Sequence, residues 1–119
     1  MTKPRNLFTQ DTEQQDTEHF DRLLQGGGVR LERILSTGQV TPSGQWYDQD
    51  TDEWVALLQG EAELTFSDGP SVRLVAGDYL FIPAHYRHRV TYTSSEPPCV
   101  WLALHVDAGS AHPPERAST

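Results

Sequence analysis

The chain has 119 residues, of which 36% are hydrophobic, and its formal net charge is −8. This length suffices for one domain with one core, and the acidic balance argues against binding to nucleic acid or to an anionic membrane surface, since both require clustered Lys and Arg. No apolar run approaches the roughly 18 residues of a membrane-spanning helix, and residues 1–6 lack the apolar core of a secretory signal. The single cysteine, Cys99, cannot form an internal disulfide, so we expect a soluble cytoplasmic protein.

Three regions are expected along the chain. Residues 1–12 are polar apart from Leu7 and Phe8 and predict an N-terminal arm, which this apolar pair would fasten to the domain surface or to a partner subunit. Residues 13–107 carry the hydrophobic segments and predict one β-barrel domain. From residue 108 to residue 119, Gly, Ser, Pro and Ala dominate without periodicity, which predicts a disordered C-terminal tail.

A short helix is predicted over residues 16–25, before the first strand. Asp16 or Thr17 can cap its beginning, and the run Gly26-Gly27-Gly28 would end it. The apolar residues that would share one helical face are Phe20, Leu23 and Leu24. We expect this to be the only helix.

The remaining hydrophobic segments predict β-strands, because they are short and are broken by glycine and proline. In chain order they cover residues 29–35, 54–58, 61–66, 72–74, 79–82, 90–93 and 99–106. Segment 61–66 alternates well, with Ala62, Leu64 and Phe66 expected to point inward. Segment 54–58 is apolar on both faces, which predicts that it is covered on both sides. An all-β fold, a small antiparallel barrel or sandwich, follows from this pattern.

Metal-capable side chains flank two of these strands at defined spacings. Glu53 is followed by six residues and then Gly60. Gly77 is followed by five residues and Pro83, and after it come His85 and His88. If the two flanking segments meet at one end of the barrel, these side chains lie close together there.

These spacings resemble the two signature motifs of the cupin superfamily, whose members are small β-barrels, or jelly rolls, that commonly hold a metal. The resemblance covers roughly residues 45 to 92 and departs from the family pattern at the first motif, where both histidines are missing. Their places are taken by Tyr47 and Gln49 or, with a longer gap, by Trp46 and Asp48. We favour the first pair, because positions 47, 49 and 53 share strand parity.

The resemblance implies a divalent-metal site at the barrel mouth, holding Fe, Mn, Ni or Zn. Glu53 and His88 match ligand positions of the two motifs. His85 stands where the family has a glycine, and with it the set is two histidines and one carboxylate, a composition typical of non-haem Fe(II) sites. Gln49 or Asp48 would add an oxygen ligand. His85 and His88 have opposite strand parity, so both reach one ion only if the turn after Pro83 curls.

Tyr47, Tyr92 and His105 are the candidate acid, base or orienting groups around such a metal; Tyr92 stands where the family has an asparagine, and His105 shares parity with Trp101. Structural roles are open as well. Glu53 would then pair with Arg87 or Arg89, and His88 would hydrogen-bond to Tyr47 or Tyr92. The acidic run at 48, 50 and 52 would be a solvated loop.

Two functions are therefore expected from the resemblance. The first is a metal-dependent enzyme, of dioxygenase or isomerase type, that acts on a small organic molecule in the barrel. The alternative is a metal-free module that binds or senses a small molecule without turnover, for which the missing histidines are the main argument. Because segment 54–58 is apolar on both faces, we also expect a homodimer formed through a sheet face or edge.

Overall fold

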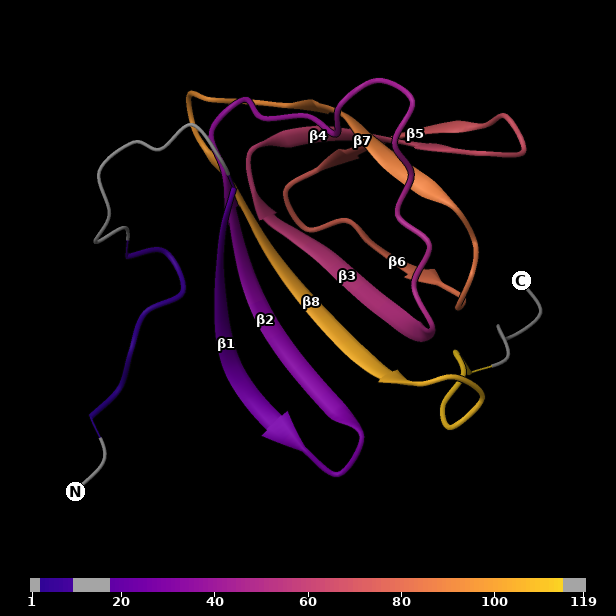
Figure 1. Cartoon of the computed structure of the whole chain (residues 1–119). Coiled ribbons are helices and arrows are strands. Elements are labelled where there is room, and N and C mark those ends of the chain that lie inside the picture. Colours follow the sequence, from indigo (N-terminus) through magenta and orange to yellow (C-terminus); the bar gives the residue numbers. More distant parts are fainter. Residues whose placement is uncertain (1–2, 10–17, 115–119) are drawn as a thin grey trace.

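The computed structural model describes residues 3–9 and 18–114 of the chain, and these residues form eight β-strands and no helix. The strands are β1 (His19–Gly26), β2 (Val29–Ser36), β3 (Thr51–Gln59), β4 (Glu61–Phe66), β5 (Ser71–Val75), β6 (Tyr79–Ile82), β7 (His88–Thr93) and β8 (Cys99–Asp107). They build a five-stranded sheet in the order β1-β2-β8-β3-β6 and a three-stranded sheet in the order β5-β4-β7 (Figure 1). The predicted all-β fold is confirmed. Within the described residues no helix is long and apolar enough to cross a membrane.

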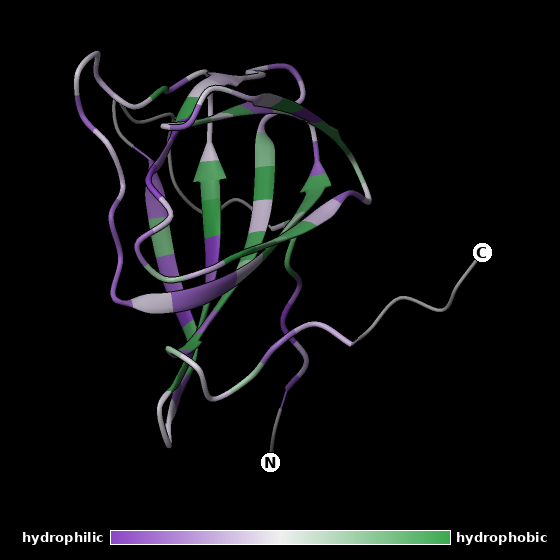
Figure 2. Ribbon diagram, turned by 90° about the vertical axis from the view of Figure 1, so that its right-hand side faces the viewer, coloured by the Kyte–Doolittle hydropathy of each residue, from purple (hydrophilic) through white to green (hydrophobic). Residues whose placement is uncertain are grey.

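The hydrophobic core lies between the two sheets. Hydrophobic and hydrophilic residues alternate along the strands (Figure 2), as expected when one face of each strand points inward. In β4 the inward residues are those predicted: Ala62, Leu64 and Phe66 are 0%, 3% and 6% exposed. The core cluster comprises Val55, Leu57, Ala62, Leu64, Phe66, Leu74, Ile82, Cys99, Trp101 and Ala103.

The predicted helix is wrong, because residues 19–26 form strand β1, paired antiparallel with β2 from His19↔Leu35 to Gly26↔Val29. A bulge between Arg22 and Leu24 interrupts the pairing. The bulge inserts one residue into the two-residue alternation, so the apolar residues of β1 take on a spacing that also fits a helix. Gly26, Gly27 and Gly28 have positive φ and make the turn of the β1–β2 hairpin. The predicted cap residues lie outside the described residues.

The loop between β6 and β7 is fixed to the beginning of β3. The Asp52 carboxylate accepts hydrogen bonds from the backbone N–H groups of Ala84 (2.8 Å) and Gly109 (3.0 Å). These hydrogen bonds lower the pKa of Asp52. Asp52 is 7% exposed, so it is not the solvated loop residue that the acidic run predicted. It holds the segment that leads into His88.

The described part of the arm lies against its own chain. The Arg33 guanidinium on β2 donates hydrogen bonds to the carbonyl oxygens of Leu7 (3.1 Å) and Thr9 (2.7 Å). Phe8 is 48% exposed. Residues 10–12 of the predicted arm and residues 115–119 of the predicted tail lie outside the described residues, and the proposed region boundaries stay predictions.

Gly60, between β3 and β4, is expected to be less replaceable than a glycine in an open turn. Its φ is +94°, and a Cβ there would lie 2.8 Å from Ser94 Oγ and 3.0 Å from the Cα of Cys99. Gly69 also has positive φ (+122°), but a Cβ added there would have open space around it to 4 Å. We therefore expect Gly60→Ala to be less stable than Gly69→Ala by about 1–3 kcal/mol, the usual cost of overpacking.

Urea denaturation of the two variants measures this difference directly. Both substitutions place an alanine at positive φ and so carry a cost in backbone strain. The difference between their free energies of unfolding therefore reports the crowding around Gly60. Equal midpoints for the two variants would contradict this account of the β3–β4 turn.

Candidate functional site

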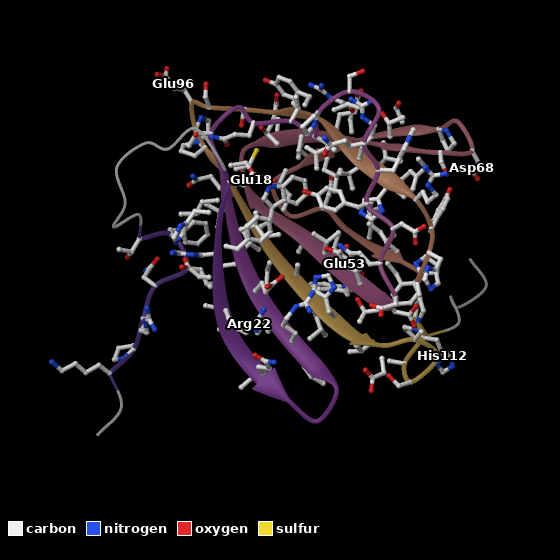
Figure 3. The ribbon with its side chains drawn as sticks, in the orientation of Figure 1. Glu18, Arg22, Glu53, Asp68, Glu96 and His112 are labelled. Carbon is white, nitrogen blue, oxygen red and sulfur yellow. The ribbon has the colours of Figure 1, made fainter. Side chains whose placement is uncertain are left out.

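The barrel encloses a cavity of about 90 Å³ between the two sheets. Its polar lining consists of Glu18, Glu32, Tyr47, Gln49, Glu53, His88 and His105, and its apolar lining of Phe20, Ile34, Val55, Leu64, Ile82, Val90 and Trp101. Phe20 is 51% exposed although it lines the cavity, so it marks the mouth. Figure 3 places Glu53 in the interior of the barrel, with Glu18 nearer the beginning of β1.

Four ionisable side chains from four strands meet in this cavity. They are Glu32 of β2, Glu53 of β3, His88 of β7 and His105 of β8, hereafter the central cluster. Glu53 Oε1 lies 3.8 Å from His88 Nε2, and Glu53 Oε2 lies 3.9 Å from His105 Nε2. Glu32 Oε1 lies 3.6 Å from His105 Nε2. Each of these side chains is at most 12% exposed.

The two imidazoles are held with Nε2 toward the carboxylates. The Nδ1 atom of His88 lies 2.9 Å from the carbonyl oxygen of Tyr86, which can only accept, so Nδ1 carries the proton and Nε2 is left with a lone pair. The Nδ1 atom of His105 lies 3.1 Å from Thr51 Oγ1. Burial lowers the pKa of both histidines, which favours neutral rings.

Glu53 is the carboxylate at the centre of the cluster. Burial, the Glu32 carboxylate and the opposing charge of Arg30 together raise its pKa from 4.5 to about 7, and burial has the largest effect. At neutral pH and with no cation bound, Glu53 is therefore protonated to a far greater extent than an exposed glutamate. Lone pairs on Glu53 and His88 face each other, so a proton or a metal cation between them relieves their repulsion.

Glu32 was missed by the sequence prediction. Its Oε2 atom lies 3.5 Å from both Arg22 and Arg30, while its Oε1 atom faces His105. Strand alternation could have identified Glu32. It lies on the same face of its strand as Ile34, and the sequence did not decide which of the two faces points inward. A charged residue on the inward face is costly unless it is paired, which makes such a position a candidate site residue.

Glu18 was missed too, because it precedes the first strand. Its Oε2 atom accepts a hydrogen bond from Ser36 Oγ at 2.8 Å, and it also hydrogen-bonds to the Tyr47 side chain. Burial raises the pKa of Glu18. Tyr47 in turn stacks on His88, with 5.6 Å between the ring centroids. Glu18 and Tyr47 thus form a second polar group in the cavity lining, apart from the central cluster.

Five of the predicted site residues line the cavity: Tyr47, Gln49, Glu53, His88 and His105. The preferred alignment of the first motif is the one whose side chains face inward, because Asp48 points away. Of the two structural alternatives, the one for Glu53 does not describe the contacts seen, since Glu53 faces the two imidazoles. The one for His88 holds in part, because His88 is buried and is hydrogen-bonded to Tyr47 through the backbone, at 2.7 and 3.1 Å, while its ring bonds to the Tyr86 carbonyl.

Two of the predicted site residues are not brought to the cavity. The Nδ1 atom of His85 lies 2.8 Å from Asp48 Oδ1, and these side chains are 67% and 49% exposed. The φ angle of His85 is +64°, the left-handed conformation of a turn residue. Tyr92 is 39% exposed, and the Arg73 guanidinium lies 5.0 Å from its ring centroid.

The central cluster contains the types of donor atom found in metal sites, but these atoms stand farther apart than the ligands of a bound ion. Among the described residues, no group of three or more His, Cys, Asp and Glu side chains is placed closely enough to hold a metal ion as it stands. Two donors on one tetrahedral ion at bonds of about 2.0–2.2 Å stand about 3.3–3.6 Å apart. The separations in the cluster, 3.6–3.9 Å, exceed this by a few tenths of an ångström. Two neutral imidazoles and two carboxylates otherwise suit a divalent cation.

Comparisons with known proteins agree with this architecture. The family model for the cupin domain matches residues 33–112. A crystal structure from Ralstonia eutropha JMP134, of a protein whose proposed activity is mannose-6-phosphate isomerase, superposes with a TM-score of 0.84 at 42% sequence identity, covering 90% of this chain and 100% of that one.

More distant structures share the fold. A cupin superfamily protein from Desulfitobacterium hafniense DCB-2 has a TM-score of 0.68 at 23% identity, with 81% of this chain and 83% of that chain covered. A conserved protein of unknown function from Streptococcus pyogenes has a TM-score of 0.64 at 21% identity, with 82% and 80% covered. No curated protein matches the chain.

We expect Glu53→Gln to stabilise the metal-stripped protein at pH 8. The folded-state pKa of Glu53, about 7, lies above the ordinary 4.5, so the folded state binds more protons in this interval and stability falls as pH rises through it. The ionised side chain costs up to about 3 kcal/mol above pH 7, and the amide removes this cost. Below pH 4.5 the two proteins should be equally stable with respect to this group.

Thermal unfolding at pH 4 and pH 8 in the presence of a chelator measures this effect. Glu61→Gln, on the exposed outer side of β4, is the matched control and should leave the pH dependence of stability unchanged. A Glu53→Gln protein that is less stable than the native chain at pH 8 would contradict the assignment of Glu53 as an uncompensated buried acid.

Proposed function

Because the chain belongs to the cupin family, we propose that it holds one divalent cation in the barrel cavity and acts there on a small organic molecule as an isomerase-type enzyme. The observation that carries the proposal is the central cluster. Its two imidazole Nε2 atoms and the carboxylates of Glu32 and Glu53 converge in one buried cavity.

Glu53, His88 and His105 would hold the cation. They form a set of two histidines and one carboxylate, and such a set leaves coordination positions open for substrate. His105 takes the role that the sequence suggested for His85, because His105 lines the cavity and His85 is exposed. Gln49, which also lines the cavity, offers a further oxygen donor. The hydrogen bond from His88 Nδ1 to the Tyr86 carbonyl is of the kind that orients metal-bound histidines.

Isomerisation next to a carbonyl group requires a polarised carbonyl and a group that moves a proton. A bound divalent cation supplies the polarisation, as a Lewis acid. Glu18 and Tyr47 would move the proton, since both line the cavity and are hydrogen-bonded to each other. The activity proposed for the R. eutropha protein, which is 42% identical, belongs to the same reaction class.

The cavity limits the size and charge of the substrate. Its volume of about 90 Å³ is smaller than the roughly 300–1,000 Å³ of pockets that enclose drug-sized ligands. Only a small molecule, or the reacting end of a longer one, would enter. The carboxylates of Glu18, Glu32 and Glu53 disfavour an anionic group deep in the cavity. A phosphate on the substrate would therefore stay at the mouth.

A second candidate is a metal-free module that binds a small molecule without turnover. It is favoured by the spacing of the central cluster, which is wider than that of a formed metal site. In that case Glu53 would keep its proton and donate it to a ligand or to an imidazole. The buried Nε1 atom of Trp101, which has no hydrogen-bond partner among the described residues and whose ring lines the cavity, would be a further donor.

Metal binding separates the two candidates. We expect chelator-treated native protein to bind close to one Mn²⁺, Ni²⁺ or Zn²⁺ per chain in calorimetric titrations. His105→Ala should weaken binding by at least about 100-fold, because removal of a direct ligand costs more than the 10–100-fold loss typical of supporting residues.

His85→Ala is the control for this titration. It removes the exposed histidine paired with Asp48 and should leave the affinity unchanged. Equal losses in both variants, or loss in His85→Ala alone, would contradict the ligand set, and no binding by the native chain would support the metal-free candidate.

The isomerase reaction has a direct readout in deuterated water. We expect the metal-loaded protein to exchange the proton next to the carbonyl of a small aldose or ketose, followed by NMR, with formation of the isomer. Glu18→Gln should reduce exchange by about 10²–10⁴-fold while metal binding stays unchanged, since a general acid–base group contributes that much. Exchange that is equally fast with Glu18→Gln would remove Glu18 from the mechanism.

A further inference from the structure

Two arginine side chains lie beside Glu32, where the β1–β2 hairpin continues beyond the residues that line the cavity. Arg22 on β1 pairs in register with Glu32 on β2, and Arg30 on β2 pairs with His105 on β8. Paired residues share a face of the sheet, and so do residues two apart on one strand, so both arginines lie on the face that carries Glu32 and His105. Figure 3 shows Arg22 farther along β1 than Glu18, toward the turn of the hairpin.

Glu32 does not use up the hydrogen-bonding capacity of the two guanidinium groups. Arg22 Nη2 and Arg30 Nε each lie 3.5 Å from the same atom, Glu32 Oε2, which is longer than an ordinary N–H···O hydrogen bond of about 2.7–3.2 Å. Arg30 Nε is buried and has no hydrogen-bond partner among the described residues. Arg22 Nη1 donates a hydrogen bond to Gln25 Oε1 at 2.8 Å. Because a guanidinium has five N–H donors, both groups have donors left for a further acceptor.

The charges at this position favour an anion, although the chain as a whole carries −8. Two guanidinium groups share one carboxylate, so Arg22, Arg30 and Glu32 together carry one positive charge. Arg30 also acts on the central cluster, since it opposes the rise in pKa that burial and Glu32 cause in Glu53 and adds to the fall in pKa that burial causes in His105. An anion beside Arg30 would therefore lie close to the atoms at which the proposed reaction takes place.

A groove of about 330 Å³ borders Arg30 and adjoins the cavity. It is lined by residues 25–29 of the β1–β2 turn and by Arg30, Thr51, His105 and Asp107. His105 also lines the cavity, so the groove and the cavity meet at this residue. The side chains of Arg22 and Arg30 are 50% and 36% exposed, so a dissolved ligand can contact both. The Asp107 carboxylate disfavours an anion at its own side of the groove, which leaves the position beside the two arginines.

We propose that Arg22 and Arg30 bind an oxyanion of the substrate, a carboxylate or a phosphate, at the mouth of the cavity while the reacting end of the molecule enters it. A guanidinium presents a planar fork of N–H donors that matches two oxygen atoms of such a group. Glu32 holds the two arginines in place before the substrate binds. The inference rests on the proposed function and names its substrate class: small carbonyl compounds with an oxyanion at the far end.

Anion binding to the chelator-treated protein tests the inference without depending on a metal. Inorganic phosphate and glycolate are titrated separately, and the backbone amide NMR signals of residues 26–30 are followed. The native chain should bind at least one of them, and the one bound more tightly identifies the oxyanion. Arg30→Gln should raise its dissociation constant by at least about tenfold, because a hydrogen bond to a charged group contributes that much.

Arg22→Gln should weaken anion binding as well, and its half-exposed position makes it safe for the fold, which circular dichroism verifies for each variant. Arg30→Lys keeps the charge but loses the planar fork, so its affinity should lie between those of the native chain and Arg30→Gln. Arg73→Gln is the matched control. Arg73 is 58% exposed on β5 of the other sheet, beside Glu61 and Tyr92, and its replacement should leave the affinity unchanged.

The deuterium-exchange assay adds a readout on the reaction. For the metal-loaded protein, Arg30→Gln should lower kcat/KM for glyceraldehyde 3-phosphate at least about tenfold more than for glyceraldehyde, which lacks the oxyanion. A native chain that binds neither anion would overturn the inference, and so would an affinity that Arg22→Gln and Arg30→Gln leave intact or that Arg73→Gln lowers equally. Anion binding that depends on the two arginines in a protein without metal binding or exchange would instead contradict the proposed function and leave the anion site standing.

Discussion

The site depends on one constraint, which is that β8 pairs with both β2 and β3 and so occupies the centre of the larger sheet. Its residue His105 lies directly opposite Arg30 on one side and Glu53 on the other. Because the side chains of paired residues point to the same face, this register brings His105 and Glu53 together inside the barrel. A shift of β8 by one residue would turn His105 outward and bury Leu104 instead. The register that fills the core therefore also places His105 in the site.

When Glu53 in the central cluster is ionised, the surrounding protein groups balance its negative charge only in part. Burial and the neighbouring Glu32 raise the pKa of Glu53 to about 7, while burial lowers the pKa values of His88 and His105. Acid and imidazoles are thus both pushed toward their neutral forms, which is the direction that isolated burial produces. A divalent cation would reverse this preference for the acid and keep it for the imidazoles, since it binds ionised carboxylate together with neutral imidazole. In the proposed function, the side chains of Glu53, His88 and His105 stand slightly too far apart in the absence of a cation and move closer together when they bind it.

The sequence was sufficient for the barrel and for half of the site. Glu53 and His88 were found from motif spacing, and Tyr47 and Gln49 from strand parity, because alternation determines facing direction within a regular strand. The helix prediction was wrong because the bulge beside Leu24 interrupts the two-residue alternation of strand β1. His85 was misjudged as close to His88 in space because its positive φ, a property of the turn, turns its side chain toward Asp48. Glu32 was accessible to the same parity argument but has no place in either motif.

The most direct measurement of the central claim is anomalous diffraction from crystals of the protein loaded with Mn²⁺. The account predicts one strong anomalous peak inside the barrel, bonded to Glu53, His88 and His105, with the distances from Glu53 to the two imidazoles shortened from the present 3.8 and 3.9 Å to those of a bound ion. A peak between Asp48 and His85 on the outer surface, or no peak in the cavity at saturating Mn²⁺, would contradict it.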